Sequence, residues 1–461
     1  MKGAGVRMGP EHSTPHRRKA AMTQKTEQLV GGDLIAEGKT KIILATKQDP
    51  EKVLIRSKDD ITAGDGAKHD LIEGKATLAT RTTCNVFRLL KACGLPVAFD
   101  EQIDAKTFLA PLCQMLPYEV VIRREAHGSY LKRMPGLTKG HLFPKLLVEF
   151  FLKTSGKKWK EHGLLCDDPL MEYSEAARTI ALYEPSKPIY AQKPFLVLQE
   201  NEVFGDPEEW KLFAEIQKIA RRAFLILEKS WQIEGRTLVD FKVEFGLTRD
   251  GALLLADVID NDSWRVLENG AYIDKQAYRD GGKLDDVAEK YRRVAAVTDH
   301  FRLPVQQVII WRGSDKDDVT PVVKALGQLC GGSTDSQRLK VTTATCSIHK
   351  EPVRGLNELH GLVQQVPDTV VIALIGRSNG AGPTLSAATT VPVITVPASF
   401  KDFPEDVWSS LRTPSNVPVT TVLEPSNAAM AALEILALRN PHFYMRLREQ
   451  VEELQVNTML V

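Results

Sequence analysis

The sequence predicts two domains of different classes, an α+β domain followed by a doubly wound α/β domain with a parallel sheet. Between residues 34 and 278, strand-like and helix-like segments follow one another without regular alternation, which is typical of an α+β domain. Beyond residue 305 they alternate regularly, which is typical of parallel strands joined by helices. The length of 461 residues also exceeds what one hydrophobic core usually organises.

Composition places the chain among globular proteins. Hydrophobic residues make up 43% of it, and 60 basic residues nearly balance 59 acidic ones. We therefore expect no binding to nucleic acid or to a membrane, and no apolar run approaches the roughly 18 residues of a membrane-spanning helix. Six cysteines without a Cys-x-x-Cys pair indicate reduced thiols rather than disulfides or zinc ligands, and hence a cytoplasmic protein.

Four segments are expected along the chain. Residues 1–30 lack apolar periodicity and predict a disordered extension, with a transit peptide as the less favoured alternative. The first domain is expected at 31–282, a charged helical linker at 283–304 and the second domain at 305–461. Strand-like runs of the first domain lie at 41–45, 53–56, 120–123, 238–245 and 253–259.

In the second domain, strand-like runs and helical patterns take turns. Strands are expected at 308–311, 340–343, 370–375, 393–396 and 419–423, and helices at 319–329, 353–363 and 426–438. In such folds ligands bind at the carboxyl edge of the sheet, so the loops that follow the strands are the first place to look for a site.

One strand of the first domain carries an organised polar face. Within 238–245, alternation puts Asp240, Lys242 and Glu244 on one face and apolar residues on the other. The dipeptide Asp250-Gly251 follows and is typical of a two-residue hairpin turn. That turn would place Glu244 opposite Asp257.

Two carboxylates in that arrangement need a positive charge between them. Cross-strand neighbours have Cβ atoms about 5 Å apart, where like charges repel. Mg²⁺ would relieve the repulsion of Glu244 and Asp257, because it accepts one or two carboxylates and keeps sites for phosphate oxygens. The alternatives are a solvated hairpin with scattered charges, or a carboxylate pair relieved by Lys242.

Basic turns elsewhere in the first domain could bind anions. A Gly turn at 37–41 presents Lys39 and Lys41 at the start of a strand, where they could hold phosphates. The run 123–129 ends another strand with guanidinium, glycine and hydroxyl groups suited to a phosphate or carboxylate. Each of these taken alone is more often an exposed charged turn. The polar run 260–265 would lie at the same end as the proposed metal.

Together these motifs resemble the phosphoribosylaminoimidazole-succinocarboxamide (SAICAR) synthetase family, as it occurs joined to an aminoimidazole ribonucleotide (AIR) carboxylase domain in animals. The match extends along nearly the whole chain after the first ~30 residues. The motifs that carry it are EGKTK at 37–41, IEGK at 72–75, GSYLKR at 128–133, LVDFKVEFG at 238–246, ADVIDNDSWR at 256–265, DK at 274–275 and YRD at 278–280.

The resemblance implies ATP-dependent amide formation, in which ATP activates the carboxylate of carboxyaminoimidazole ribonucleotide (CAIR) and L-aspartate attacks it. Carried over by motif, Lys39, Lys41 and Met115 would contact ATP, and Glu244 and Asp257 would hold Mg²⁺. Lys242 would be catalytic. The residues that would position CAIR are Arg123, Ser129, Asp240, Arg265, Lys275 and Arg279. Two departures from the family pattern, His127 and Gln114, replace none of these residues.

Three loops of the second domain are expected to converge at the carboxyl edge of its sheet. The Gly-rich run 376–383 follows a buried-looking strand, and the runs 313–317 and 347–352 follow two others. Glycines there expose backbone N–H groups to an anion. His349 would be a candidate acid or base at this edge, although a lone histidine is more often structural.

These loops resemble the AIR carboxylase family, which carboxylates AIR with CO₂ and without ATP. The chain has no biotin-acceptor Met-Lys-Met sequence, so biotin is not expected. By this resemblance His349 would move the ring proton. The residues that would bind AIR or CO₂ are Ser314, Asp317, Ser347, Arg377 and Ser378. The resemblance also implies a homo-oligomer, an octamer, that assembles through this domain.

The second domain departs from its family at several loop positions. Asp315-Lys316 stand where the family has a variable residue followed by serine, Ile348 and Glu351 replace small residues beside His349, and Ala387-Ala388 replace Gly-Asn. Three readings follow: a bifunctional enzyme that converts AIR to CAIR and then to SAICAR, an active synthetase with a degenerate carboxylase-like domain kept for assembly, or a non-catalytic binding scaffold. Intact Glu244 and Asp257 disfavour the last.

Overall fold

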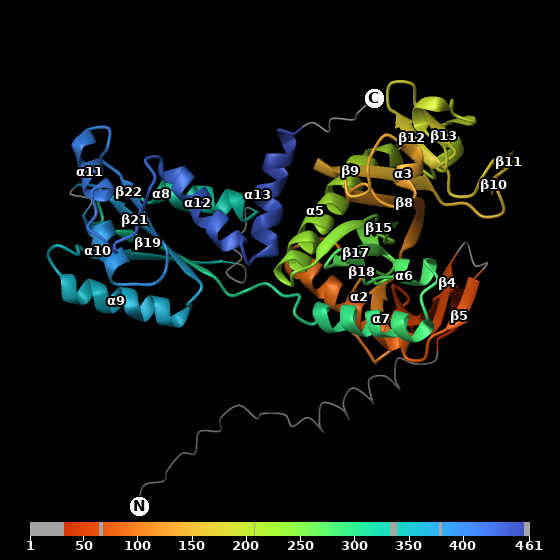
Figure 1. Ribbon diagram of the computed structural model, residues 1–461, viewed down its shortest axis with the longest axis horizontal. Helices are drawn as coiled ribbons and strands as arrows, with labels where there is room; N and C mark the ends of the chain where they lie inside the picture. Colours follow the sequence, from red (N-terminus) through yellow and green to blue (C-terminus); the bar gives the residue numbers. More distant parts are fainter. Residues whose placement is uncertain (1–31, 64–67, 207, 332–338, 378–379, 456–461) are drawn as a thin grey trace, which may run out of the picture.

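The computed structural model describes residues 32–63, 68–206, 208–331, 339–377 and 380–455. The predicted N-terminal extension and Ser378 lie outside these ranges. The chain folds into two lobes joined by a short stretch around residue 303 (Figure 1). No helix in the described ranges is long and apolar enough to cross a membrane.

The first lobe contains two antiparallel sheets, in agreement with the α+β prediction. The smaller sheet has the order β1-β2-β3-β7-β6, with strands at Leu34–Glu37, Lys41–Ala45, Lys52–Ser57, Thr107–Pro111 and Glu101–Gln102. β2 and β3 coincide closely with two predicted strands. A separate two-stranded ribbon pairs β4 (Asp60–Ala63) with β5 (Lys68–Leu71).

The larger sheet has nine strands and carries most of the polar motifs. Its order is β14-β13-β12-β9-β8-β15-β17-β18, and β16 also pairs with β15. Its strands, in the order of the chain, are β8 Gln114–Glu125, β9 Leu142–Leu152, β12 Leu170–Ser174, β13 Thr179–Tyr183, β14 Leu196–Gln199, β15 Thr237–Leu247, β16 Leu253–Ala256, β17 Trp264–Glu268 and β18 Ala271–Tyr272. A further short pair, β10 (Lys158–Trp159) and β11 (His162–Gly163), projects from this lobe.

Helices complete the core of the first lobe. α2 (Lys75–Ala92) and α5 (Leu212–Ile233) bury apolar faces against the sheets, and short helices α3 (Tyr130–Arg133), α4 (Glu200–Val203) and α6 (Gln276–Arg279) lie in connections. α7 (Leu284–Thr298) falls in the segment expected to be a linker. It is no spacer, because it packs on α2 and buries Val294 and Val297 in the first core.

The second lobe is a parallel sheet with helices on both faces, as predicted. The order β20-β19-β21-β22-β23 is parallel throughout. α8 and α12 cover one face of the sheet, and α9 and α10 cover the other. The elements are β19 Gln307–Arg312, α8 Thr320–Leu329, β20 Lys340–Thr345, α9 Pro352–Gln365, β21 Thr369–Ile375, α10 Ala381–Ala387, β22 Val393–Pro397, α11 Trp408–Leu411, β23 Thr420–Thr421 and α12 Pro425–Ala437.

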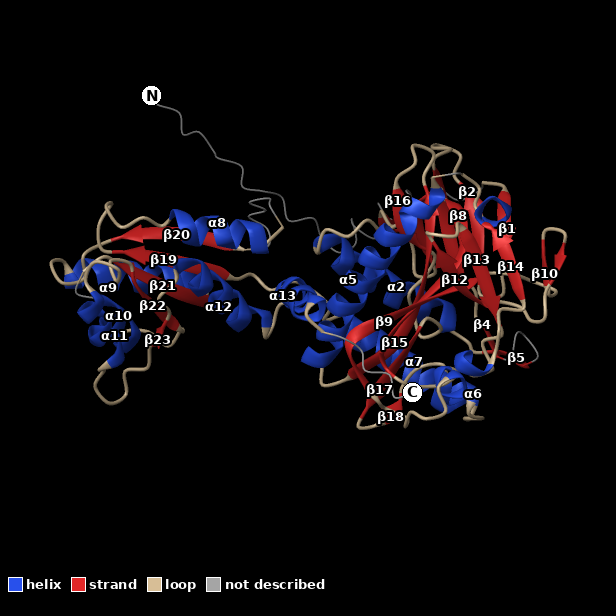
Figure 2. Cartoon of the chain, turned by 90° about the horizontal axis from the view of Figure 1, so that it is seen from above, coloured by secondary structure: helices blue, strands red, loops and turns tan. Residues whose placement is uncertain are grey.

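The last helix, α13 (Pro441–Glu453), was not expected from the sequence and belongs to both lobes. Phe443 lies in the core cluster of the second lobe, and Met445 lies in that of the first. The helix runs back along α5 between the lobes (Figure 2). The two domains are therefore joined by packing as well as by the chain.

The hairpin that connects β15 and β16 differs from the prediction. Glu244 pairs with Ala256 rather than with Asp257. The turn has three residues instead of two, because Thr248 N–H donates to Ala252 O (3.0 Å), and Gly251, the last residue of the turn, adopts a left-handed conformation (φ 83°). A type I turn followed by a left-handed glycine is the common three-residue hairpin loop, and it moves the register by one position.

Candidate active sites

The first candidate site forms where β15 changes partner. The first half of β15 pairs with β17, and its second half, from Glu244, pairs with β16. The loop 257–263 leaves the sheet at this point, and Lys242 N–H reaches it by donating to Ser263 O (2.7 Å). Asp257 begins the loop with a left-handed backbone (φ 66°), a conformation that aspartate tolerates better than most residues. The polar face of β15 therefore opens onto an acidic loop.

Three adjoining cavities run along this region. The first, about 370 Å³, shares Lys242, Asp262 and Arg279 with the second, about 190 Å³. The second shares Lys41, Glu244 and Asp257 with the third, about 500 Å³. Every first-domain site residue expected from the sequence lines at least one of them: Lys39, Lys41, Met115, Arg123, Ser129, Asp240, Lys242, Glu244, Asp257, Arg265, Lys275 and Arg279.

One end of the chain of cavities is built on a buried carboxylate between two arginines. Arg123 on β8 and Arg265 on β17 flank Asp240 in register, and both donate to its Oδ2, at 2.8 and 2.6 Å. Asp240 is 4% exposed and Arg123 is 3% exposed. The guanidinium of Arg265 also lies against Gly128, where an added Cβ would come within 2.4 Å of it. Since buried ion pairs fix geometry, both guanidinium groups are held in place before any ligand arrives.

The middle cavity contains two carboxylates that face lysines. Lys41 forms an ion pair with Asp257, and Lys153 Nζ lies 2.5 Å from Glu244 Oε2. Burial lowers the pKa of the Lys41 ammonium to about 8, although the charge of Glu244 opposes the shift. The lysines neutralise Glu244 and Asp257, which line the same cavity despite the shifted register.

This arrangement suits a hard divalent cation. Glu244 and Asp257 supply two carboxylates at one cavity. Within the ranges that the structure covers, no group of three or more His, Cys, Asp or Glu side chains is placed to hold a metal ion. A cation here would therefore take two carboxylates and complete its coordination with phosphate oxygens and water, as Mg²⁺ commonly does.

A second buried ion cluster lies beside the middle cavity. Asp262 accepts from Lys275 Nζ (3.1 Å), and Lys75 Nζ lies 3.6 Å from the same oxygen. Burial would raise the pKa of Asp262, but the two ammonium groups lower it to about 2. Tyr291 on α7 donates to the other carboxylate oxygen. The helix expected as a linker thus supports the loop that carries Asp262.

The two ends of the site differ in polarity. The cavity at the far end is largely apolar and lies between β2, β3 and β8, with Met115 at its rim and Ile43 and Ala98 in its wall. Such a surface suits a flat heterocycle. Toward the other end, Lys242 projects from β15 and donates to Glu119 Oε2 (2.7 Å). Lys242 is therefore held at the junction of the two polar cavities.

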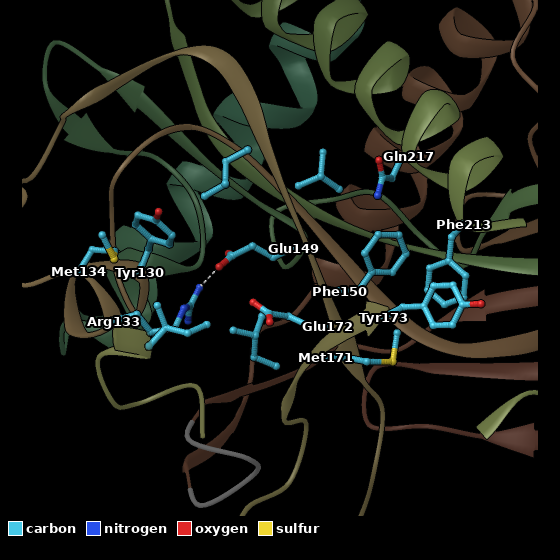
Figure 3. Close-up of a pocket in the computed structure, with 14 residues that line it drawn as sticks. Tyr130, Arg133, Met134, Glu149, Phe150, Met171, Glu172, Tyr173, Phe213 and Gln217 are labelled. Carbon is cyan, nitrogen blue, oxygen red and sulfur yellow. Dashed lines mark hydrogen bonds and ion pairs between the residues drawn. The ribbon is translucent and has the colours of Figure 1, made fainter. Parts of the chain in front are cut away.

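Another pocket, of about 500 Å³, is shown in Figure 3 and is linked to Arg123 through Glu149, which lines it. Its wall is apolar, with Phe150, Met171 and Phe213, and Arg133 from α3 points into it to meet Glu149. Glu149 also accepts from Arg123 Nε (2.7 Å). The back of the arginine cluster is thus closed by a carboxylate shared with this pocket.

In the second lobe, the expected loops do meet at the carboxyl edge of the sheet. Asp317 accepts from the Ser314 backbone N–H (3.0 Å). Its Oδ1 lies so close to Gly376 that an added Cβ would come within 2.4 Å. The neighbouring Arg377 stacks on Phe403, with its guanidinium carbon 4.0 Å from the ring centre. Gly376 is therefore required for the close approach of two loops.

His349 and Ser347 lie in the third loop of this edge. His349 is exposed, and its Nε2 would be 3.5 Å from a Cβ added to Gly380. The carbonyl of Ser347 accepts from Lys350 and Glu351 N–H and shapes the turn. His349 thus lies beside the Gly-rich loop, as the sequence predicted.

The departures from the family pattern lie in different environments. Ile348 is 3% exposed and packs beside Gly355, so its bulk enters the core instead of crowding His349. This corrects the expectation that replacement of a small residue by Ile348 adds bulk beside His349. Asp315 and Glu351 instead form ion pairs with Arg312 and Arg354 on the same surface.

Lys153 and Lys75 are functional candidates that sequence reasoning missed. Lys153 directly follows β9, and its position opposite Glu244 depends on strand order that no local pattern reveals. Lys75 belongs to the motif at 72–75, which could have indicated its importance, but the sequence predicted no function for that motif. Its side chain is 1% exposed at the start of α2.

Two family models match the chain. The SAICAR synthetase model matches residues 34–191 and 196–297, and the AIR carboxylase model matches residues 307–457. The first match extends over both sheets that form the cavities. The second begins at β19 and includes α13.

Curated relatives match along both lobes. A probable multifunctional protein ADE2 of Caenorhabditis elegans is 35% identical over 434 residues, which covers 91% of this chain and 93% of the relative. The Homo sapiens bifunctional phosphoribosylaminoimidazole carboxylase/phosphoribosylaminoimidazole succinocarboxamide synthetase is 36% identical over 444 residues, 92% of this chain and 95% of the relative. A crystal structure of phosphoribosylaminoimidazole-succinocarboxamide synthase from Ehrlichia chaffeensis is 26% identical, covers 58% of this chain and 98% of that chain, and has a TM-score of 0.46.

Proposed function

The chain belongs to the family of bifunctional enzymes that join a SAICAR synthetase to an AIR carboxylase, and we propose that it catalyses both reactions. The second domain carboxylates AIR to CAIR, and the first domain ligates CAIR to L-aspartate at the expense of ATP. The observation that carries the synthetase assignment is the row of three adjoining cavities, lined by every synthetase-site residue that the sequence predicts.

In the ligase reaction, a carboxylate oxygen of CAIR attacks the γ-phosphorus of ATP, and ADP leaves. The amine of aspartate then attacks the acyl carbon, loses a proton, and phosphate leaves as the amide forms. Protein groups act here by position and charge, since phosphoryl transfer requires little covalent participation from the enzyme. The apolar cavity at Met115 receives the adenine, and Lys39 and Lys41 face the phosphates.

CAIR takes the cavity at the other end. Arg123 and Arg265 are fixed on Asp240 and offer their remaining N–H groups to the ribonucleotide, with Ser129 and Arg279 on the facing wall. Lys275, which is paired with Asp262, lies where the carboxylate of CAIR would meet the γ-phosphate. Lys242 stands at this junction and stabilises the charge that develops there.

Glu244 and Asp257 would hold Mg²⁺ in the middle cavity, and the ion would neutralise the phosphate charge as the leaving group departs. With Mg²⁺ on Glu244 and Asp257, the ammonium groups of Lys41 and Lys153, which now pair with these carboxylates, would be available to phosphate oxygens. The positive charges of the two lysines would therefore be compensated by carboxylates before ATP binds and by phosphates afterwards.

In the carboxylase reaction, the nucleophilic ring carbon of AIR attacks CO₂, and the proton at that carbon must then be removed. His349 takes this proton, Ser314, Asp317 and Arg377 hold the ribose and phosphate, and Ser347 lies toward CO₂. The family resemblance assigns a CO₂-binding role to Ser378 as well, which is outside the described residues. The meeting of the three loops at the carboxyl edge supports this arrangement. No biotin is needed, because CO₂ itself is the electrophile.

The synthetase assignment is tested by measuring ADP release from the purified chain. Release should require CAIR, aspartate and Mg²⁺ together, and omission of any one should reduce it to background. ATP turnover that proceeds without CAIR would contradict the assignment.

A second candidate function concerns the carboxylase domain, which could serve assembly alone. It is favoured by Asp315 and Glu351, which stand in family loop positions and pair with nearby arginines instead of facing a ligand. Purified chain supplied with AIR and bicarbonate should form CAIR. Absence of CAIR, in a preparation whose synthetase is active, would exclude the carboxylase activity and support the assembly role.

We further propose that the chain is a cytoplasmic homo-oligomer, an octamer, assembled through the carboxylase domain. His349, Ser314 and Arg377 are exposed in the single chain, which supports a neighbouring copy that covers this edge. Light scattering would give the mass of the assembly, and a monomer at micromolar concentration would contradict it.

A further inference from the structure

The last helix of the second domain ends in a buried ion cluster inside the first. Glu452 on α13 is fully buried. Its Oε1 accepts from Arg124 Nη2 (2.5 Å) and Arg448 Nε (3.1 Å), and its Oε2 accepts from Arg221 Nη2 (2.8 Å) and from the Leu146 backbone N–H (3.0 Å). A carboxylate is stable in such a place because each oxygen is fully paired.

Hydrogen bonds also fix the start of α13 to the second domain. Asn440 caps the helix by accepting from the N–H groups of His442 and Phe443, at 2.9 and 3.2 Å. Its amide also donates to Gln306 Oε1 (2.8 Å), directly before β19. The position of Glu452 therefore depends on where the second domain lies.

Glu452 meets the first domain at an irregularity in its central sheet. Arg123 on β8 pairs with Leu147 on β9, but Glu125 pairs with Leu142, so residues 143–146 bulge out opposite Arg124. Bulges commonly re-aim side chains next to active sites. The one here lies beside Arg123, whose guanidinium reaches Asp240 in the ribonucleotide cavity.

The backbone of this bulge is satisfied by the groups that Glu452 organises. Arg124 Nη1 donates to Phe143 O (3.0 Å) and Pro144 O (3.2 Å). Arg221 donates to Leu146 O (3.0 Å), and Arg448 donates to Pro144 O (2.8 Å). Without Glu452, the Leu146 N–H would lose its partner, and Arg124, Arg221 and Arg448 would lose the carboxylate that they share.

The chain beyond β8 continues into the ribonucleotide cavity. Ala126 is tied to the segment that precedes the bulge, because its N–H donates to His141 O (2.9 Å) and its carbonyl accepts from Gly140 N–H (3.0 Å). Gly128 then lies against the guanidinium of Arg265, and Ser129 lines the cavity. A shift of the bulge would move Arg123 on one side and the Gly128 loop on the other.

We infer that Glu452, in the carboxylase domain, is a positioning residue for the CAIR site of the synthetase domain. The inference rests on the proposed function of that site. It makes the affinity of one domain for CAIR depend on the docking of the other, which is the domain that produces CAIR. Glu452 touches no substrate and acts through Arg124 and the bulge.

The test compares two isosteric variants on the same helix of the full chain. Glu452→Gln removes the negative charge that Arg124, Arg221 and Arg448 share. It should raise KM for CAIR about fivefold to tenfold, with kcat and KM for ATP within about twofold of the parent. Glu449→Gln is the matched control, because Glu449 pairs with Arg222 on α5 and with Arg446 on its own helix rather than with the described residues 143–146. It should leave all three constants near the parent values.

A helix that only holds the domains together would behave differently, since both variants would then lower the melting temperature or the active fraction without separating KM for CAIR from KM for ATP. If Glu452→Gln does not fold, Arg448→Met tests the same cluster from its more exposed side and should raise KM for CAIR about twofold to threefold. KM for CAIR unchanged in the folded variants of an active parent would overturn the inference alone. A parent with no CAIR-dependent turnover would overturn the proposed function as well.

Discussion

The two candidate sites are built in opposite ways. In the first domain, Arg123, Asp240 and Asp262 are buried or nearly so, and each is fixed by ion pairs with neighbouring strands or helices. In the second domain, His349, Ser314 and Arg377 are exposed on loops, and His349 forms no hydrogen bond or ion pair with the other residues that the structure describes. The first site is thus assembled before substrate arrives, whereas the second presents its side chains to solvent or to another copy.

This difference follows from the folds. An antiparallel sheet can place charged side chains side by side across strands, where each limits the freedom of the next. A parallel doubly wound sheet brings its functional residues together only at the ends of strands, on loops. The first site should therefore be sensitive to changes in packing, and the second to the loss of single reacting groups.

The largest effect is expected from loss of a reacting group in the second domain. His349→Ala should lower AIR carboxylation about 10²- to 10⁴-fold, because it removes the group that takes the ring proton. ADP release driven by added CAIR should be unchanged. The two assays on one preparation measure this separation, and a parallel loss of both activities would mean that the sites are not independent.

The corresponding change in the first domain is Glu244→Ala. It should lower CAIR-dependent ADP release about 10²- to 10³-fold, because the phosphates lose the cation that neutralises them. Carboxylation of AIR should persist. Glu215→Ala, at an exposed position of α5, is the control. Retained ADP release in Glu244→Ala would remove the metal assignment.

A smaller change compares the packing of the two sites directly. Gly128→Ala places a Cβ within 2.4 Å of the Arg265 guanidinium at a left-handed position, and Gly380→Ala places one 3.5 Å from His349 Nε2. The first should raise KM for CAIR about 10- to 100-fold, whereas the second should change carboxylation by less than about threefold. Steady-state kinetics of both variants would measure the contrast. Equal effects would show that the second site is as tightly packed as the first.

The smallest effect concerns pH. Since burial lowers the pKa of Lys41 to about 8, the ammonium loses its charge as pH rises through that value and no longer attracts phosphate. The ratio kcat/KM for ATP should therefore fall above pH 8, by about tenfold per pH unit at the limit. Lys41→Arg should be less efficient but should keep a flat profile there, because a guanidinium stays protonated. A parent profile that is flat to pH 9.5 would contradict the role of Lys41.

Much of the first site was accessible from local pattern. Alternation along β15 depends on neighbouring residues alone, so Asp240, Lys242 and Glu244 were correctly placed on one face. The hairpin register was not accessible in the same way. Asp250-Gly251 is compatible with both a two- and a three-residue loop. A two-residue type I′ loop needs a positive φ at both positions, whereas here Gly251 has one and Asp250 does not.

In the second domain, too, local pattern predicted some features and missed others. The alternation of strands and helices correctly predicted its parallel sheet and the convergence of its loops. The direction of Ile348, however, depended on the space left by Gly355 on a different element. The sequence suggested that Ile348 adds bulk beside His349, but its side chain packs in the core.

By itself, the sequence determined the residue types, their faces on each element and the order of the elements, because these follow from chain-local periodicity and turn chemistry. Tertiary structure decided which distant groups meet. The Leu146 N–H and Glu452 are 306 positions apart along the chain, and Lys153 meets Glu244 across strand order that no local pattern encodes. Such pairs form because burial leaves each charge and each backbone N–H needing a partner, and only the folded chain supplies one.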